Sequence, residues 1–241
     1  DEIGGEGVLY YDDQKVMDFC KEANRAGLQI ELHAIGDRAF DQACRAIKAA
    51  LDDYPREDHR HGIIHDCLPT PEGIQICRDY HIQMPMQSAF IGWKQEPDDY
   101  LEHILGHDRL EKLNPIKTFR DNDIMVSFGS DAPCTTPDPI VWMDRAVNND
   151  NAGQAVSVQD ALRMCTYNGA WAAFDEQERG SLEAGKIADM AVLSENPYTV
   201  PKDKLSGLRV ERLYLGGKPY ESCRESILPM MLRGLTSRNK A

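Results

Sequence analysis

The sequence lacks any long hydrophobic run, and positive charge is scarce in it. No apolar stretch among its 241 residues approaches the roughly 18–20 residues that a membrane-spanning helix needs. Lys and Arg total 27 against 40 Asp and Glu, a formal net charge of −13. Because nucleic-acid binding depends mainly on clustered basic groups, this excess of acid argues against a nucleic-acid partner. The 41% of hydrophobic residues predicts an ordinary globular protein, with neither a membrane nor a nucleic acid as its partner.

The chain also lacks the signs of a secreted protein held together by disulfides. Its seven cysteines are scattered and include no Cys-x-x-Cys pair, a pattern typical of reduced thiols. The first seven residues contain no initiator Met and no apolar signal-peptide core. We therefore expect a cytoplasmic protein whose sequence begins inside a longer chain, so that any targeting segment would precede residue 1.

Hydrophobic periodicity predicts short strands that alternate with helices. Strands of this length between amphipathic helices are typical of βαβ units and a parallel sheet. The predicted helices cover 12–26, 38–51, 71–80 and 115–122, with another that begins at Ser157 and runs towards Phe174; the predicted strands cover 28–33, 61–65, 81–86 and 123–130.

Two regions depart from this alternation. Residues 87–114 show no clear periodicity, and a loop of that length inside a compact domain is usually functional. Strands are predicted again at 188–193 and 210–215, and Gly216-Gly217 is typical of a hairpin turn. The last part of the chain is therefore expected to be a small β subdomain.

Three of the predicted strands end at a potential metal ligand. His33 and His65 end the first two strands, and Asp131 follows the fourth. Because the carboxyl ends of parallel strands meet at one edge of a sheet, we expect the three side chains to converge there. Imidazole nitrogen and carboxylate oxygen suit zinc or another divalent transition ion. Taken singly, each histidine could instead be a hydrogen-bonded structural residue, and Asp131 could cap a turn.

Five sequence motifs carry a resemblance to a known family. They are HAIGDRA (33–39), HGIIH (61–65), GSDAP (129–133), TYNGA (166–170) and GSLEAGKIAD (180–189). Together and in this order they resemble the metal-dependent amidohydrolase superfamily, and within it amidohydrolase family 3, which includes N-substituted formamide deformylases. The resemblance covers nearly the whole chain.

The resemblance implies an α/β fold that is the C-terminal half of a (β/α)₈ TIM-type barrel, strands five to eight, followed by part of a small β-sandwich subdomain. The implied boundaries are 1–178 for the barrel half, 179–222 for the β-sandwich part and 223–241 for a C-terminal tail. The family's His-x-His pair on strand one and its bridging Lys or acid on strand four have no counterpart here. His59-Arg60-His61 fits the first pattern, but it directly precedes strand six and is not expected to bind metal.

The function implied by the resemblance is a metal-dependent hydrolase of carbon–nitrogen bonds other than peptide bonds, such as amides or formamides. His33, His65 and Asp131 are the implied metal ligands, for one or two divalent ions, with zinc the expected metal. His65 and Asp131 are the implied catalytic residues, Asp131 as general base and then general acid to a metal-activated water. We expect a small amide-type substrate, and activity only with the N-terminal half of the barrel or a partner chain. The alternative is a non-catalytic half-barrel that serves as a binding or assembly module.

The chain departs from the family pattern between the two histidines of the second strand. Family members commonly carry Arg and Glu there, where this chain has Gly62 and Ile64, so the polar contacts of those side chains are not expected. In the 87–114 region, Phe90, Trp93 and Tyr100 could line an apolar substrate pocket or simply pack within the loop.

Overall fold

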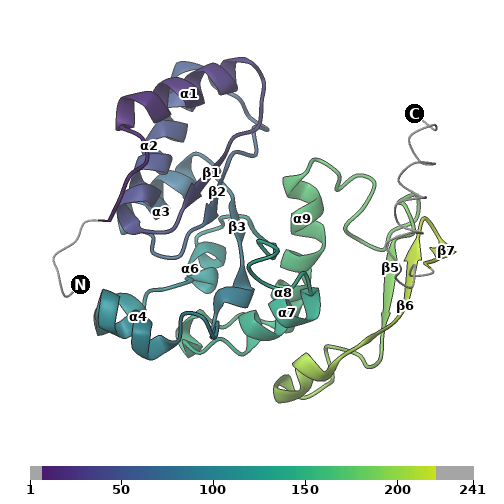
Figure 1. Ribbon diagram of the computed structural model, residues 1–241. Coiled ribbons are helices and arrows are strands. Elements are labelled where there is room, and N and C mark those ends of the chain that lie inside the picture. The colour runs from purple at the N-terminus through teal and green to yellow at the C-terminus, as the bar shows by residue number, and fades with distance from the viewer. Residues whose placement is uncertain (1–6, 221–241) are drawn as a thin grey trace, which may run out of the picture.

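Parallel strands lie side by side at the centre of the protein. The structure is a computed structural model that describes residues 7–220 (Figure 1). Its parallel strands are β1 (Glu31–Ala34), β2 (Gly62–His65), β3 (Met84–Met86) and β4 (Val126–Phe128). β1 pairs with β2 and β3 pairs with β4, and a parallel bridge between Gly62 and Gln83 connects the two pairs. The strands therefore follow one another across the protein in their order along the chain.

Pro85 explains why β2 and β3 meet at so short a contact. The Gln83 N–H donates to His61 O on the β2 side, and the next N–H, of Met84, donates to Met125 O on the β4 side. The nitrogen of residue 85 faces β2 again, but proline has no N–H to donate. The sequence predicted a strand over 81–86 with Pro85 at its end; the observed strand is shorter, and Pro85 lies inside it.

The predicted helices are present between the strands. α1 (Asp13–Arg25) precedes β1, α2 (Asp37–Asp53) and α3 (Pro71–Asp79) follow β1 and β2, and α6 (Ile116–Asp121) precedes β4. Asp12 caps α1 by accepting from the Lys15 N–H at 2.8 Å, and Thr70 caps α3 with Pro71 in the first turn. No helix within residues 7–220 is both long enough and apolar enough to cross a membrane.

The region 87–114 is more ordered than the sequence predicted. It forms η1 (Ser88–Phe90), α4 (Asp98–Leu105) and α5 (His107–Leu110). Gly106 separates α4 from α5 at a φ of 79°, a conformation that favours glycine. Helices of four to eight residues show little periodicity, which is why the sequence pattern missed them.

The helices after β4 also differ from the prediction. α7 (Pro139–Val147) was not predicted, although Asp138 before Pro139 is a helix-start signal, and the Asp138 carboxylate accepts from the Ile140 N–H at 3.0 Å. The helix that begins at Ser157 is two helices, α8 (Val158–Cys165) and α9 (Tyr167–Ala172), because Thr166 leaves helical geometry at a ψ of −88°. Ser157 caps α8 as expected.

The β subdomain has the predicted hairpin. An antiparallel sheet contains β5 (Met190–Leu193), β6 (Val210–Leu215) and β7 (Lys218–Pro219). Gly216 and Gly217 both have positive φ, as the tight turn between β6 and β7 requires. The short helices η2 (Ala152–Gln154) and η3 (Lys202–Gly207) complete the described elements. The predicted tail at 223–241, with Cys223, lies outside the described residues.

The hydrophobic core lies between the parallel strands and the helices that cover them. Fully buried Phe40 of α2 and Phe119 of α6 pack with ring centroids 6.3 Å apart. The Cys44 and Cys77 sulfurs, from α2 and α3, lie 3.5 Å apart in this core. All six cysteines that the structure describes are free.

An ion pair connects the amino end of β2 to the segment after α9. The Arg60 guanidinium donates to both carboxylate oxygens of Glu176, at 2.8 and 2.9 Å, with side chains only 8% and 10% exposed. The same guanidinium lies over the rings of Trp171 and Phe174, at 4.6 and 4.1 Å from their centroids. This ion pair holds together two chain segments more than 100 residues apart, at the amino end of β2.

His61, at the start of β2, is buried with its hydrogen bonds satisfied. Its Nδ1 accepts from the Ile30 N–H at 3.1 Å, so the neutral ring carries its proton on Nε2 and donates it to Asn24 Oδ1 at 3.0 Å. The Asn24 amide in turn donates to Ala50 O and Tyr54 O. A second proton would be buried without an acceptor, and burial lowers the pKa of His61 to about 3.

We expect this buried histidine to weaken the protein in acid. An unfolded histidine takes up a proton near pH 6.5, whereas folded His61 does so near pH 3. Between these values the unfolded state binds more protons, so the free energy of unfolding falls as pH falls, by up to about 1.4 kcal/mol per pH unit. Urea unfolding over this range measures the slope. His61→Asn, which keeps an acceptor for Ile30, should flatten the slope, and exposed His107→Asn should not; equal slopes in all three proteins would contradict the assignment.

Candidate functional site

The structure brings His33 and His65 into contact at the carboxyl ends of neighbouring strands. In the parallel register of β1 and β2, His33 lies beside Ile64 and Ala34 beside His65. The two imidazole rings are 4.4 Å apart between centroids and meet edge to face at 77°. His65 has a φ of 81°, so the backbone turns out of the strand at this residue. Two of the predicted ligands are therefore neighbours.

Asp131 follows β4 and acts on the same histidine from a distance. Burial lowers the pKa of His65 and neighbouring His33 lowers it further, whereas Gln87 and the Asp131 carboxylate oppose the shift. His65 is only 6% exposed, and its lowered pKa favours the neutral ring. A neutral imidazole retains a lone pair, which is the state a metal ligand requires.

The donor set suits a divalent ion in kind but is incomplete in number. Among residues 7–220, no three His, Cys, Asp or Glu side chains converge closely enough to hold a metal ion. His33 and His65 make two such donors, and Asp131 does not complete a group of three. The buried Nδ1 of His65 has no hydrogen-bond partner within the described chain, so this nitrogen is not engaged in holding the fold together.

His59 and His61 are structural residues, as the sequence analysis expected. His59 Nδ1 accepts from the His61 N–H at 2.9 Å, and its Nε2 lies 2.9 Å from Tyr80 O, to which it donates. The ring nitrogens of His61 are engaged by Ile30 and Asn24. Neither ring has a lone pair left for a metal ion.

Gly62 makes room for an acidic side chain that sequence reasoning missed. A Cβ at Gly62 would lie 2.3 Å from Glu31 Oε2 and 3.0 Å from Gln83 Cγ. The Gln83 amide donates to Glu31 Oε1 at 3.0 Å. Glu31 is an exposed residue, but the protein packed near its carboxyl group desolvates it in part and raises its pKa to about 7. Strand alternation places Glu31 on the same face as His33, a signal that could have identified it.

Asp66 is a second carboxyl group that sequence reasoning missed. It follows His65 at a φ of 51° and is completely buried. Neither carboxyl oxygen has a hydrogen-bond partner in the part of the chain that the structure covers. Burial raises the pKa of Asp66 well above its ordinary range, which favours the neutral acid.

Of the three predicted aromatic residues, Phe90 lies beside His65 and Trp93 packs against Phe90. The Phe90 ring is 6.1 Å from that of His65 and 5.0 Å from that of Trp93, measured between centroids. Phe90 ends η1, directly after β3, so the chain that leaves this strand carries the ring to the site. Tyr100 lies on α4 and is 49% exposed.

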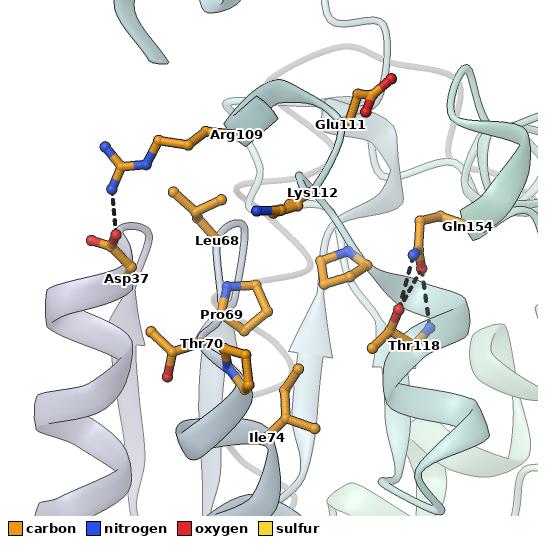
Figure 2. Close-up of a pocket in the computed structure, with 12 residues that line it drawn as sticks. Asp37, Leu68, Pro69, Thr70, Ile74, Arg109, Glu111, Lys112, Thr118 and Gln154 are labelled. Atoms are coloured by element: carbon orange, nitrogen blue, oxygen red, sulfur yellow. Dashed lines mark hydrogen bonds and ion pairs between the residues drawn. The ribbon is translucent and has the colours of Figure 1, made fainter. Parts of the chain in front are cut away.

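A separate pocket of about 340 Å³ lies between the connecting loops and α3, α5 and α6. Figure 2 shows its walls, with Leu68, Pro69 and Ile74 on one side and Thr118 and Gln154 on the other. At its edge the Arg109 guanidinium donates to the Asp37 carboxylate. His33, His65 and Asp131 do not line this pocket, so it is distinct from the histidine pair.

The fold and the paired imidazoles define a class: an α/β protein with two adjacent histidine side chains where its parallel strands end. The family model described as "Amidohydrolase family" matches residues 4–220. The chain belongs to this family, amidohydrolase family 3, as its motifs predicted.

Curated relatives extend well beyond this chain. The putative amidohydrolase YtcJ of Bacillus subtilis (strain 168) is 26% identical over 229 residues, which are 90% of this chain and 42% of that protein. N-substituted formamide deformylase of Arthrobacter pascens is 29% identical over 227 residues, 88% of this chain and 40% of that protein. The chain thus spans about two fifths of the length of these relatives.

Solved structures have the same fold. An uncharacterized metal-dependent hydrolase from Pyrococcus furiosus superposes with a TM-score of 0.66 at 26% identity, over 76% of this chain and 37% of that one. Another, from Pyrococcus horikoshii, gives a TM-score of 0.70 at 23% identity, over 83% of this chain and 41% of that one. The α/β part of the predicted fold is confirmed.

We expect Gly62 and Glu31 to be energetically coupled. Gly62→Ala should push the Glu31 carboxyl away from Gln83 and lower the free energy of unfolding by about 1–2 kcal/mol, through overpacking and a lost hydrogen bond. In a Glu31→Ala background the same substitution should cost markedly less. Chemical denaturation of the four proteins of this double-mutant cycle measures the coupling. Additive effects would show that the two groups do not compete for one space.

Proposed function

We propose that this chain is part of a metal-dependent hydrolase that cleaves carbon–nitrogen bonds other than peptide bonds, in small amides or formamides. The observation that carries the proposal is the contact between His33 and His65 at the carboxyl ends of β1 and β2, in a chain of the amidohydrolase family. The formamide deformylase among its relatives supports this substrate class.

In this proposal His33, His65 and Asp131 are ligands of a divalent ion, with zinc the expected metal. Imidazole nitrogen and carboxylate oxygen are donors that zinc prefers. The chemistry supplied by such an ion is Lewis-acid activation of water and of a carbonyl group near neutral pH. Since the described donors are too few for a complete site, the remaining ligands would come from the rest of the protein.

Asp131 would handle the proton. A carboxylate beside the site can accept a proton from the attacking water and then donate it to the departing nitrogen, so that water and amide yield a carboxylic acid and an amine. His65, whose pKa is lowered by burial, would hold its Nε2 towards the reacting carbonyl or the ion. Phe90 and Trp93 would form an apolar wall that contacts the substrate and excludes bulk water.

The architecture we propose is half of a barrel. β1 to β4 would be strands five to eight of a (β/α)₈ barrel, and β5 to β7 would be part of a β-sandwich. In residues 7–220 the outer edges of β1 and β4 pair with no further strand. Unpaired strand edges in a parallel sheet are normally covered, and four strands are too few to close a barrel. The N-terminal half or a partner chain would cover both edges.

Metal content and turnover of the intact protein test the proposed site. We expect purified protein to contain a divalent metal and to hydrolyse members of a panel of small amides and formamides. His65→Ala should lower both metal content and turnover. Asp131→Ala should lower turnover by about 10²–10⁴-fold, the usual contribution of general acid–base catalysis. Both variants should keep the circular dichroism spectrum of the wild type.

The control is His107→Ala, on the exposed surface of α5, which should change neither metal content nor turnover. Near-normal rates in His65→Ala or Asp131→Ala would remove the proposed roles. Intact protein that contains no metal and hydrolyses none of the panel would favour the non-catalytic assembly module instead.

The proposed half-barrel predicts how the isolated chain behaves. A polypeptide of these 241 residues alone should self-associate, because the free edges of β1 and β4 offer unpaired backbone groups. Analytical ultracentrifugation should detect dimers or larger species, and co-expression with the preceding part of the protein should suppress them. A monodisperse monomer would show that both edges are stable without a cover.

A further inference from the structure

Gln87 lies where the parallel strands end, and half of its side-chain amide is unused. It directly follows β3 and is 7% exposed. Its Nε2 donates to Pro85 O at 3.3 Å, and a Cβ built on Gly129, just after β4, would lie 4.0 Å from the same nitrogen. Its Oε1 is buried, and nothing in the described chain donates to it. A buried amide oxygen without a donor is costly, so its presence here calls for an explanation.

His65 has the complementary deficit. Its Nδ1 is buried, and among residues 7–220 no group bonds to it. Gln87 is one of the side chains that interact with the His65 ring, and β2 and β3, whose ends carry the two residues, are joined by the bridge between Gly62 and Gln83. One side chain therefore holds an unused acceptor and its neighbour an unused ring nitrogen, at the ends of β3 and β2.

We propose that Gln87 is a positioning residue whose Oε1 accepts the Nδ1–H of His65, which leaves the Nε2 of His65 unprotonated and available as a ligand. Neither atom gives up another described partner to form this bond. The effect of this hydrogen bond on metal binding rests on the function proposed above. Its effect on the tautomer of His65 does not depend on that function.

The tautomer matters because a neutral histidine has one donor nitrogen and one acceptor nitrogen. Without a fixed partner at Nδ1, His65 could place its proton on Nε2, and that nitrogen would then have no lone pair. A hydrogen bond from the other ring nitrogen commonly fixes the tautomer and orientation of a ligating histidine, and its loss typically costs about 10–100-fold in metal affinity. Gln87 is uncharged, so it can play this role without adding a negative charge next to the ion.

Nuclear magnetic resonance reads the tautomer directly. In metal-free intact protein labelled with ¹⁵N-histidine, at a pH above the usual histidine pKa, the ring nitrogen shifts show which nitrogen carries the proton. His65 is assigned by the signals lost in His65→Asn. Wild type and Gln87→Glu, which keeps an acceptor, should carry the proton on Nδ1. Gln87→Met, which has no acceptor oxygen, should move it towards Nε2.

The matched control is Gln75→Met on the exposed face of α3, where the amide donates only to Asp79. It should leave the His65 signals unchanged. Zinc affinity, measured by competition with a chelator, should fall by about 10–100-fold in Gln87→Met and should change little in Gln87→Glu and Gln75→Met. Thermal unfolding of the four proteins shows whether a lost affinity reflects lost fold.

The outcomes separate this inference from the proposed function. If His65 in the wild type carries its proton on Nε2, or if Gln87→Met leaves the tautomer unchanged, Gln87 is not the positioning residue. If the tautomer follows Gln87 as expected but the intact protein binds no zinc or other divalent ion, the inference stands and the proposed metal chemistry is wrong.

Discussion

The parallel pairing of β1 with β2 is the constraint on which the rest of the structure depends. It places the ends of two strands, and thus His33 and His65, side by side although they are 32 residues apart in the chain. The opposite end of β2 is fixed by polar groups with nearly complete hydrogen bonding: neutral His61 joins β2 to the start of β1, and Arg60 joins it to Glu176. At the carboxyl end, by contrast, ring and amide atoms lack partners among the described residues. At the amino end of β2, His61 and Arg60 are held in hydrogen bonds within the protein, whereas His65 and Gln87 at the carboxyl ends of β2 and β3 have atoms that no described group bonds and that are free to bind a ligand. This arrangement fits a ligand site at the carboxyl ends.

Local sequence patterns predicted the elements and the family, because these depend on residues close together in the chain. The caps at Asp12 and Ser157 and the alternation of strands with helices are of this kind. The strand-end positions of His33 and His65 followed from the same alternation. Contacts between distant segments were not predictable in this way. The break at Thr166 divides what periodicity presents as one helix, and the short helices of 87–114 leave too weak a pattern to detect.

The exchange at Gly62 shows why a departure from a family pattern needs a structure to interpret it. The sequence alone indicated only that Gly62 replaces a polar side chain and loses the contacts of that side chain. In the structure the vacated space holds the carboxyl group of Glu31, which Gln83 orients, so an acidic group from β1 lies where a side chain of β2 would otherwise extend. A polar group therefore still lies beside Gly62, although it now comes from the neighbouring strand. Nothing in the spacing of motifs could reveal this, because residues 31 and 62 are neighbours only through the register of β1 and β2.

The electrostatics of the histidine pair favour a cation over an anionic ligand. Burial and the nearness of His33 both lower the pKa of His65, which disfavours a positive charge on this ring and therefore an anionic ligand beside it. Asp131 supplies a negative potential of the kind that a divalent ion would satisfy. Burial raises the pKa of Asp66, adjacent in sequence, and so favours its neutral form. In the proposed metal site, Asp131 would be the one acidic ligand beside the two imidazoles, and the described residues alone would leave a divalent ion short of ligands. The proposal therefore needs further donors from outside the described residues.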